Sequence, residues 1–150
     1  MTKKFTPEKI ESLKDLGGNG IFVFGSNVQG EHCGGAAFVA ASKFGAIEGQ
    51  GVGLQGSSYA IPTCIRLTFE KEGKSFRYTK PFKSVEAIKP FVEIFINDAD
   101  HNPDLTFYVT KIGCGIAGFK VEEIAELFRP CVYMNNVILP KEFVDYIIKS

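Results

Sequence analysis

The sequence has no excess of charge of either sign. Seventeen lysines and arginines balance seventeen aspartates and glutamates over 150 residues, so the formal net charge is zero. No run of basic residues interleaved with aromatics stands out, and a balanced chain has no net field that would hold a polyanion. We therefore expect no nucleic acid as the main partner.

Long apolar runs and paired cysteine motifs are also missing. The longest apolar stretches fall well short of a bilayer span, and the first residues lead into a polar segment instead of an apolar signal core. The four cysteines, Cys33, Cys64, Cys114 and Cys131, show no C-x-x-C spacing. These absences predict no membrane segment and indicate reduced thiols in a cytoplasmic protein. We also expect no metal site and no cofactor.

The length and composition correspond to one domain. A chain of 150 residues with 45% hydrophobic content is large enough to bury about two-thirds of its unfolded surface. Predicted strands and helices alternate in at least three strand–helix steps, and no internal repeat or low-complexity segment interrupts them. We expect a single α/β domain over residues 1–150, with a mixed sheet between helix layers in a three-layer α/β/α arrangement.

Apolar periodicity and turn residues place the individual elements. Thr6 and Pro7 predict an opening helix, and residues 51–56 form a second glycine-rich segment that we interpret as a flexible loop. A hairpin is expected at the periphery, with Gly73 taking the left-handed position in its turn. Strands are predicted at residues 21–24, 59–61, 66–69, 75–78, 105–110 and 136–139, and further helices at 37–44, from 85 onward, 121–128 and 141–149.

A glycine-rich turn joins the strand at 105–110 to the helix at 121–128. The span from Gly113 to Gly118 satisfies G-x-G-x-x-G, in the strand–turn–helix context that the pattern requires. Such a turn exposes backbone N–H groups and a helix N-terminus to an anion. It predicts a phosphate-bearing ligand, held by Gly113, Cys114, Gly115, Ile116, Ala117, Gly118 and Phe119.

A second turn of the same design precedes the helix at 37–44. It begins after the first strand and contains Gly25, Ser26, Asn27, Gly34, Gly35 and Ala36. A tight connection without a ligand remains the alternative for either turn alone. Two such turns in one small domain favour a binding site.

Three side chains near the second turn are candidates for chemistry. Asn27, at the end of a strand, is suited to orient a ribose hydroxyl or a water, or to make an Asx-type turn contact. His32 is a candidate proton shuttle or ribose contact, and Cys33 is a weaker candidate nucleophile because adjacent side chains rarely point at one another.

With these motifs in place, the chain resembles the macro domain superfamily, whose α/β/α fold binds ADP-ribose. The resemblance covers most of residues 21–139 and extends to bacterial and phage macro-like proteins with Phe-Val-Phe-Gly-Ser-Asn and Ile-Gly-Cys-Gly motifs. It implies that Asn27 contacts the distal ribose, that residues 34–36 form the first glycine-rich loop, and that residues 113–119 embrace the diphosphate.

The resemblance also shows departures. One branch with a similar Ile-Gly-Cys-Gly loop, the terminal ADP-ribose glycohydrolases, uses a lysine and an aspartate where this sequence has Cys64 and Ala117. A lysine Schiff-base mechanism is therefore not expected. The acidic residue that holds the adenine amino group in many macro domains has no clear counterpart in this sequence, where Asp15 is the one aspartate before residue 21.

The expected function is binding of ADP-ribose or a related nucleotide-diphosphate metabolite, with weak hydrolysis as an addition. The alternatives are an ADP-ribosyl or ADP-ribose-derivative hydrolase that uses Asn27 and His32, or less favourably Cys33, and a ligand-free interaction module. A dinucleotide-dependent redox domain fits less well, because Pro140 and Lys141 stand where an acidic residue should follow the next strand. The oligomeric state is left open.

Overall fold

The computed structural model describes residues 4–150. This part of the chain contains one six-stranded mixed sheet. The sheet order is β2-β3-β1-β5-β6, and β4 pairs with β3. β1 runs parallel to β3 and β5, β6 runs parallel to β5, and β2 and β4 run antiparallel to β3. The strands are β1 (Gly20–Asn27), β2 (Gly53–Gln55), β3 (Ser58–Lys71), β4 (Lys74–Pro81), β5 (Thr106–Val109) and β6 (Val137–Ile138).

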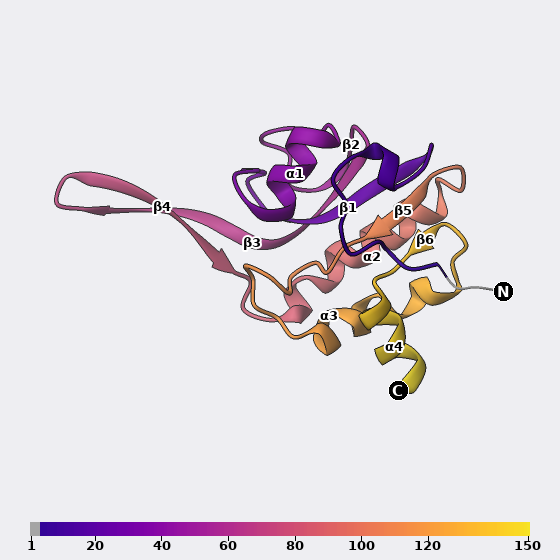
Figure 1. Ribbon diagram of the computed structural model, residues 1–150. Helices are drawn as coiled ribbons and strands as arrows, with labels where there is room; N and C mark the ends of the chain where they lie inside the picture. The colour runs from indigo at the N-terminus through magenta and orange to yellow at the C-terminus, as the bar shows by residue number, and fades with distance from the viewer. Residues whose placement is uncertain (1–3) are drawn as a thin grey trace.

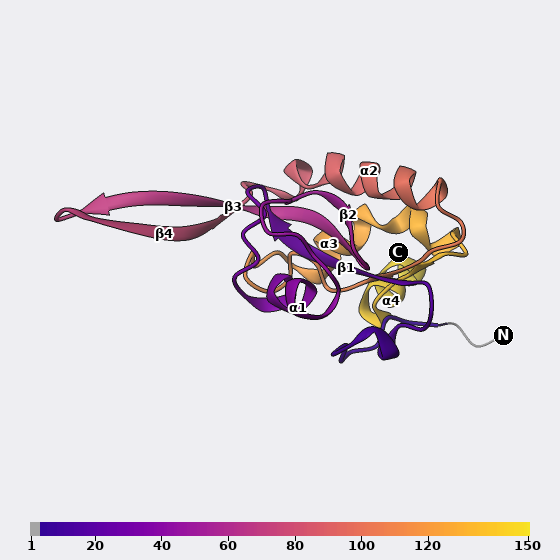
Figure 2. The same ribbon diagram turned by 90° about the horizontal axis from the view of Figure 1, so that it is seen from above.

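Helices cover both faces of this sheet, as the view along its edge shows (Figure 2). Helix α1 packs on one face, whereas α2, α3 and α4 pack on the other. The architecture is therefore the expected three-layer α/β/α arrangement. The helices are α1 (Gly35–Lys43), α2 (Lys89–Asp100), α3 (Val121–Leu127) and α4 (Lys141–Lys149), with short 3₁₀ helices at Leu13–Asp15, Val85–Ala87 and Arg129–Tyr133.

Alternation along β1 builds the two cores. Ile21 and Val23 face the larger core under α2, α3 and α4, and Phe22 and Phe24 face the smaller core under α1. Successive strand side chains point to opposite faces, so an uninterrupted apolar run is what a central strand covered on both sides requires. None of the helices described between residues 4 and 150 is long and apolar enough to cross a membrane.

Strands β3 and β4 continue beyond the sheet as a two-stranded arm that projects from the body (Figure 1). The predicted hairpin is confirmed, and its strands are longer than the sequence patterns indicated. Glu72 and Gly73 both have left-handed backbone angles, with φ of 53° and 75°. Two consecutive positive φ values give the tight turn that matches the twist of the flanking strands.

Two local predictions are wrong. Residues 7–12 are not helical, because the Thr6 hydroxyl donates hydrogen bonds to the Val109 and Ile138 carbonyls (2.6 and 3.1 Å) and ties this segment to the sheet. Only the 3₁₀ helix at Leu13–Asp15 remains of the expected opening helix. Within residues 51–56, Gly53–Gln55 forms the edge strand β2 instead of a flexible loop, because it pairs with the start of β3. Residues 1–3, which belong to the opening segment without an apolar signal core, lie outside the described residues.

Candidate functional site

A cavity of about 240 Å³ opens where β1 and β5 end and where β3 passes Thr63 and Cys64 on its way into the arm. The carboxyl ends of parallel strands meet at one edge of a sheet, and ligands of open α/β sheets bind there. Both glycine-rich turns reach this edge. Among the residues singled out in the sequence, the cavity is lined by Gly25, Ser26, Asn27, Cys33, Gly34, Gly35, Ala36, Cys64, Gly113, Gly115, Ile116 and Ala117.

Three residues of the turn at residues 113–119 do not line this cavity. The Cys114 thiol lies 3.5 Å from the Ile112 carbonyl oxygen, and burial raises its pKa to about 11. Phe119 packs against the larger core. The Gly118 N–H donates to the Gly115 carbonyl at 3.0 Å. These three residues shape the turn, and its exposed middle part faces the cavity.

The middle of the turn at residues 113–119 presents backbone donors without acceptors. Hydrogen bonds from Gly118 to Gly115 and from Phe119 to Gly113 close the turn. The N–H groups of Gly115, Ile116 and Ala117 have no hydrogen-bond acceptor within residues 4–150. Successive N–H groups of this kind form a concave anion-binding surface.

The N-terminus of α1 supplies a second set of such donors. Its N-cap is Gly34, which has no side chain to cap the helix. The N–H groups of Gly35, Ala36 and Ala37 consequently have no acceptor in the described part of the chain, and all three residues line the cavity. The partial positive charge of a helix N-terminus adds to the attraction for an anion.

Glycine serves different purposes along these turns. Gly113 has a φ of 75°, and a Cβ there would lie 3.0 Å from Ile124 Cδ1, so the turn itself requires glycine. Gly34 and Gly115 have no left-handed φ, and no atom lies within 4 Å of where a Cβ would be. Local structure does not demand glycine at these two positions, and a side chain there would occupy the cavity instead.

The Asn27 side chain closes the loop that follows β1. Its Nδ2 donates to the Glu31 carbonyl, and its Oδ1 accepts from the Glu31 N–H, both at 2.9 Å. Asn27 is 7% exposed and lines the cavity. The amide therefore makes a local backbone contact, although it reaches four residues along the chain and not the two of an Asx turn, and it fixes the backbone of Glu31.

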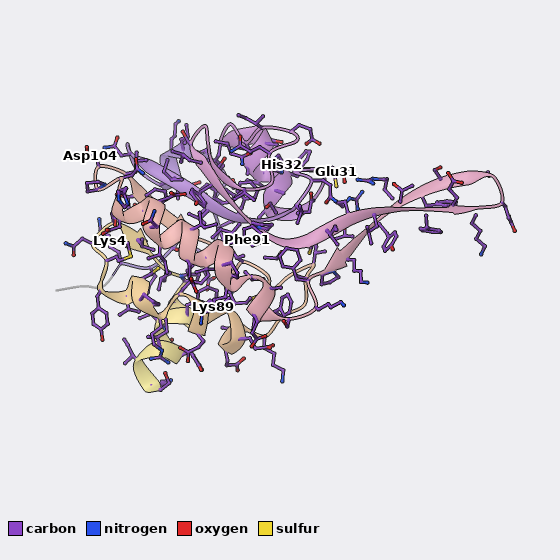
Figure 3. The ribbon with its side chains drawn as sticks, turned by 180° about the vertical axis from the view of Figure 1, so that it is seen from behind. Lys4, Glu31, His32, Lys89, Phe91 and Asp104 are labelled. Atoms are coloured by element: carbon purple, nitrogen blue, oxygen red, sulfur yellow. The ribbon has the colours of Figure 1, made fainter. Side chains whose placement is uncertain are left out.

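The Glu31 carboxylate is the charged group that sequence reasoning missed. It accepts hydrogen bonds from Arg77 (2.5 Å) and Arg66 (3.0 Å), which lie on the two strands of the arm. The Arg77 guanidinium, helped by Arg66, holds the Glu31 pKa below its usual range. Glu31 lies where the arm leaves the body (Figure 3) and lines the cavity together with Thr79. No short motif could have found this cluster, because its members are 35 and 46 residues apart in the chain.

The structure does not bring His32 into the cavity. The ring is 4% exposed, and its Nε2 lies 2.8 Å from the Ile47 carbonyl oxygen and 3.2 Å from Gln55 Oε1. It also packs edge-on against Phe24. Its neighbours Glu31 and Cys33 line the cavity, whereas the imidazole is turned toward the segment before β2. The Nδ1 atom is buried without a hydrogen-bond partner in the described residues.

The remaining ionisable groups around the cavity are two thiols and one lysine. All four cysteines of the chain are free thiols, and Cys33 is exposed whereas Cys64 is buried. Burial raises the pKa of the Cys64 thiol. Lys111 forms an ion pair with Glu142, which raises the Lys111 pKa.

A second cavity of about 330 Å³ adjoins the first and shares Ala36, Thr110 and Lys111 with it. Asp15 does not line it; its carboxylate accepts hydrogen bonds from the Glu11 and Ser12 N–H groups. The further lining residues come from the opening segment, β1, α1 and the start of α4; they are Thr6, Pro7, Glu8, Ile10, Phe22, Val39, Pro140 and Glu142.

Within residues 4–150, no group of three or more histidine, cysteine, aspartate or glutamate side chains is placed to hold a metal ion. No protein-family model, curated protein or solved structure matches the chain.

Proposed function

We propose that this protein binds ADP-ribose or a related nucleotide-diphosphate metabolite, as a macro-domain-like binding protein. The observation that carries the proposal is the pair of N–H clusters on one cavity, at residues 35–37 and 115–117, which have no acceptors of their own. A diphosphate offers oxygens to both clusters at once. The zero net charge of the chain is no obstacle, because backbone donors supply the attraction.

The dimensions suit such a ligand. The two adjoining cavities have volumes of about 240 and 330 Å³, within the range of small-molecule sites when taken together. The first would take the diphosphate and the sugar beside Asn27. The second, which has apolar contributions from Phe22, Ile10 and Val39, would take the nucleoside.

Binding is favoured over hydrolysis by the state of the candidate catalytic groups. The Asn27 amide is engaged with Glu31, and the His32 ring is outside the cavity lining. Glu31 is paired with two arginines, and its lowered pKa makes it a weak base. Cys64 and Ala117, both in the lining, supply neither an amine nucleophile nor a carboxylate.

The test is isothermal titration calorimetry with ADP-ribose on the wild type and on Gly115→Glu. Position 115 has space for a side chain and no left-handed φ, so the variant should fold and place a carboxylate in the diphosphate position. Gly18→Glu is the matched control, because Gly18 also has free space and lies outside both cavity linings.

We expect Gly115→Glu to weaken binding roughly 10- to 150-fold, which corresponds to the loss of one charge-assisted hydrogen bond of about 1.5–3 kcal/mol. Gly18→Glu should bind as the wild type does. Absence of binding by a folded wild type would overturn the proposal. Equal weakening of binding in both variants would show that the diphosphate does not bind in this cavity.

A further inference from the structure

The projecting arm has two chemically different faces. Residues directly opposite each other in an antiparallel pair lie on the same face of the ribbon. The register of β3 and β4 therefore assigns a set of apolar side chains and lysines to one face, which we call the aromatic face: Ile65, Leu67, Phe69, Lys71, Lys74, Phe76, Tyr78 and Lys80. The other face carries Arg66, Thr68, Glu70, Ser75, Arg77 and Thr79.

Three rings on the aromatic face form one exposed cluster. Phe69 stacks on Phe76 with ring centroids 5.1 Å apart, and Tyr78 meets Phe69 edge-on at 5.6 Å. Phe69, Phe76 and Tyr78 are 45%, 42% and 40% exposed. The arm extends away from all helices in both ribbon views, so no other element of the described chain covers the cluster (Figures 1 and 2).

The cations of the two faces differ in their pairing. On the polar face, Arg66 and Arg77 both bind the Glu31 carboxylate. On the aromatic face, Lys71, Lys74 and Lys80 have no ion-pair partner within residues 4–150, and the face carries no carboxylate. These three unpaired lysines lie beside exposed aromatic rings, an arrangement that favours an anionic partner with flat apolar groups.

We propose that the aromatic face of the arm binds single-stranded nucleic acid, with bases on the Phe69, Phe76 and Tyr78 rings and phosphates on the three lysines. Proteins that bind single strands without sequence preference combine these two elements. The charged turn between Lys71 and Lys74 is unsuited to insertion into a lipid layer. Two arms packed face to face would set lysine against lysine.

Whole-chain balance conceals this local charge. Residues 66–83 contain six lysines and arginines against two glutamates, so the remainder of the chain is negative by the same excess. The sequence-based expectation of no nucleic-acid partner rested on the net charge of the whole chain, which is zero. A projecting arm presents its own charge at a distance from the compensating carboxylates, and screening limits their influence beyond about 10 Å.

Fluorescence anisotropy with a labelled single strand of about 12 thymidines tests the proposal on the full chain. Lys71→Gln/Lys74→Gln/Lys80→Gln removes the phosphate contacts, and Lys9→Gln/Lys14→Gln/Lys149→Gln is the control with the same change in net charge elsewhere. We expect the arm variant to flatten the slope of log K against log salt by about 2, at 0.7 per phosphate contact. The control should leave the slope unchanged.

Phe69→Ala tests the stacking contribution. Loss of one base–aromatic stack should weaken binding about 5- to 150-fold, whereas Thr68→Ala on the opposite face should change it little. Gly115→Glu should bind the oligonucleotide as the wild type does, which separates this proposal from that for the cavity.

Any of three results overturns the proposal. The first is the absence of single-strand binding at about 50 mM salt, and the second is equal weakening by the two lysine triples. The third is a dimer in sedimentation analysis that Phe69→Ala dissociates, which would assign the aromatic face to a second copy of this chain.

Discussion

Replacement of Asn27 by alanine separates a structural role from a direct role in ligand contact. The Asn27 amide makes two hydrogen bonds to the backbone of Glu31, both at 2.9 Å. Alanine leaves the Glu31 N–H and carbonyl without these partners. It also frees the loop that carries Glu31 and leads to the N-terminus of α1.

The expected loss of stability follows from the number of bonds. Each intramolecular hydrogen bond contributes about 0.5–1.5 kcal/mol net, so two give roughly 1–3 kcal/mol. For a chain of 150 residues, 1 kcal/mol changes the melting temperature by about 2–4 °C. Asn27→Ala should therefore melt roughly 2–12 °C below the wild type.

Thermal unfolding followed by circular dichroism measures this shift. Asn19→Ala is the control, because Asn19 is exposed and its amide makes a single 3.2 Å bond to the Asp104 carbonyl. The reasoning is refuted if Asn27→Ala melts within about 1 °C of the wild type. An unchanged melting temperature together with lost ADP-ribose binding would mean that the amide acts on the ligand instead.

Two further predictions concern the charged and nucleophilic groups of the cavity. Arg77 and Arg66 lower the Glu31 pKa, so Glu31 stabilises the fold above its unfolded pKa and this contribution disappears as the pH falls through the folded value. The difference in melting temperature between wild type and Glu31→Gln should thus shrink as the pH falls below 4.5, the ordinary pKa of a glutamate, and a constant difference would contradict the assignment. Iodoacetamide should alkylate Cys33 first, because Cys33 is exposed whereas burial raises the pKa of Cys64 and, to about 12, of Cys131. Mass spectrometry should show protection by ADP-ribose, and labelling of Cys64 at the rate of Cys33 would be evidence against this order.

Local patterns carried most of the element predictions. The predicted helix over residues 141–149 matches α4, and the one over 121–128 matches α3 to within one residue, because both have a clear apolar stripe. The hairpin followed from strand alternation around Gly73. These features depend on interactions between residues near in sequence, which a single sequence contains in full.

The failures occur where distant residues decide the local structure. A helix start at Thr6 is a sound local prediction, yet the Thr6 hydroxyl bonds to carbonyls 103 and 132 residues away. The segment at Gly53–Gln55 becomes a strand because β3 offers a free edge. Tertiary hydrogen bonds outweigh local propensity in both cases.

The sequence by itself determined that two glycine-rich turns follow β-strands, since the turn residues and the periodicity around them are local properties. Only the tertiary structure decided that both turns face one cavity and that Arg66 and Arg77 hold Glu31 beside it. It also decided that His32 does not line this cavity. The same holds for the arm, whose lysines and rings share a face only because of the register between β3 and β4. Strand order and register bring residues that are far apart in sequence together, and a short motif contains no information about either.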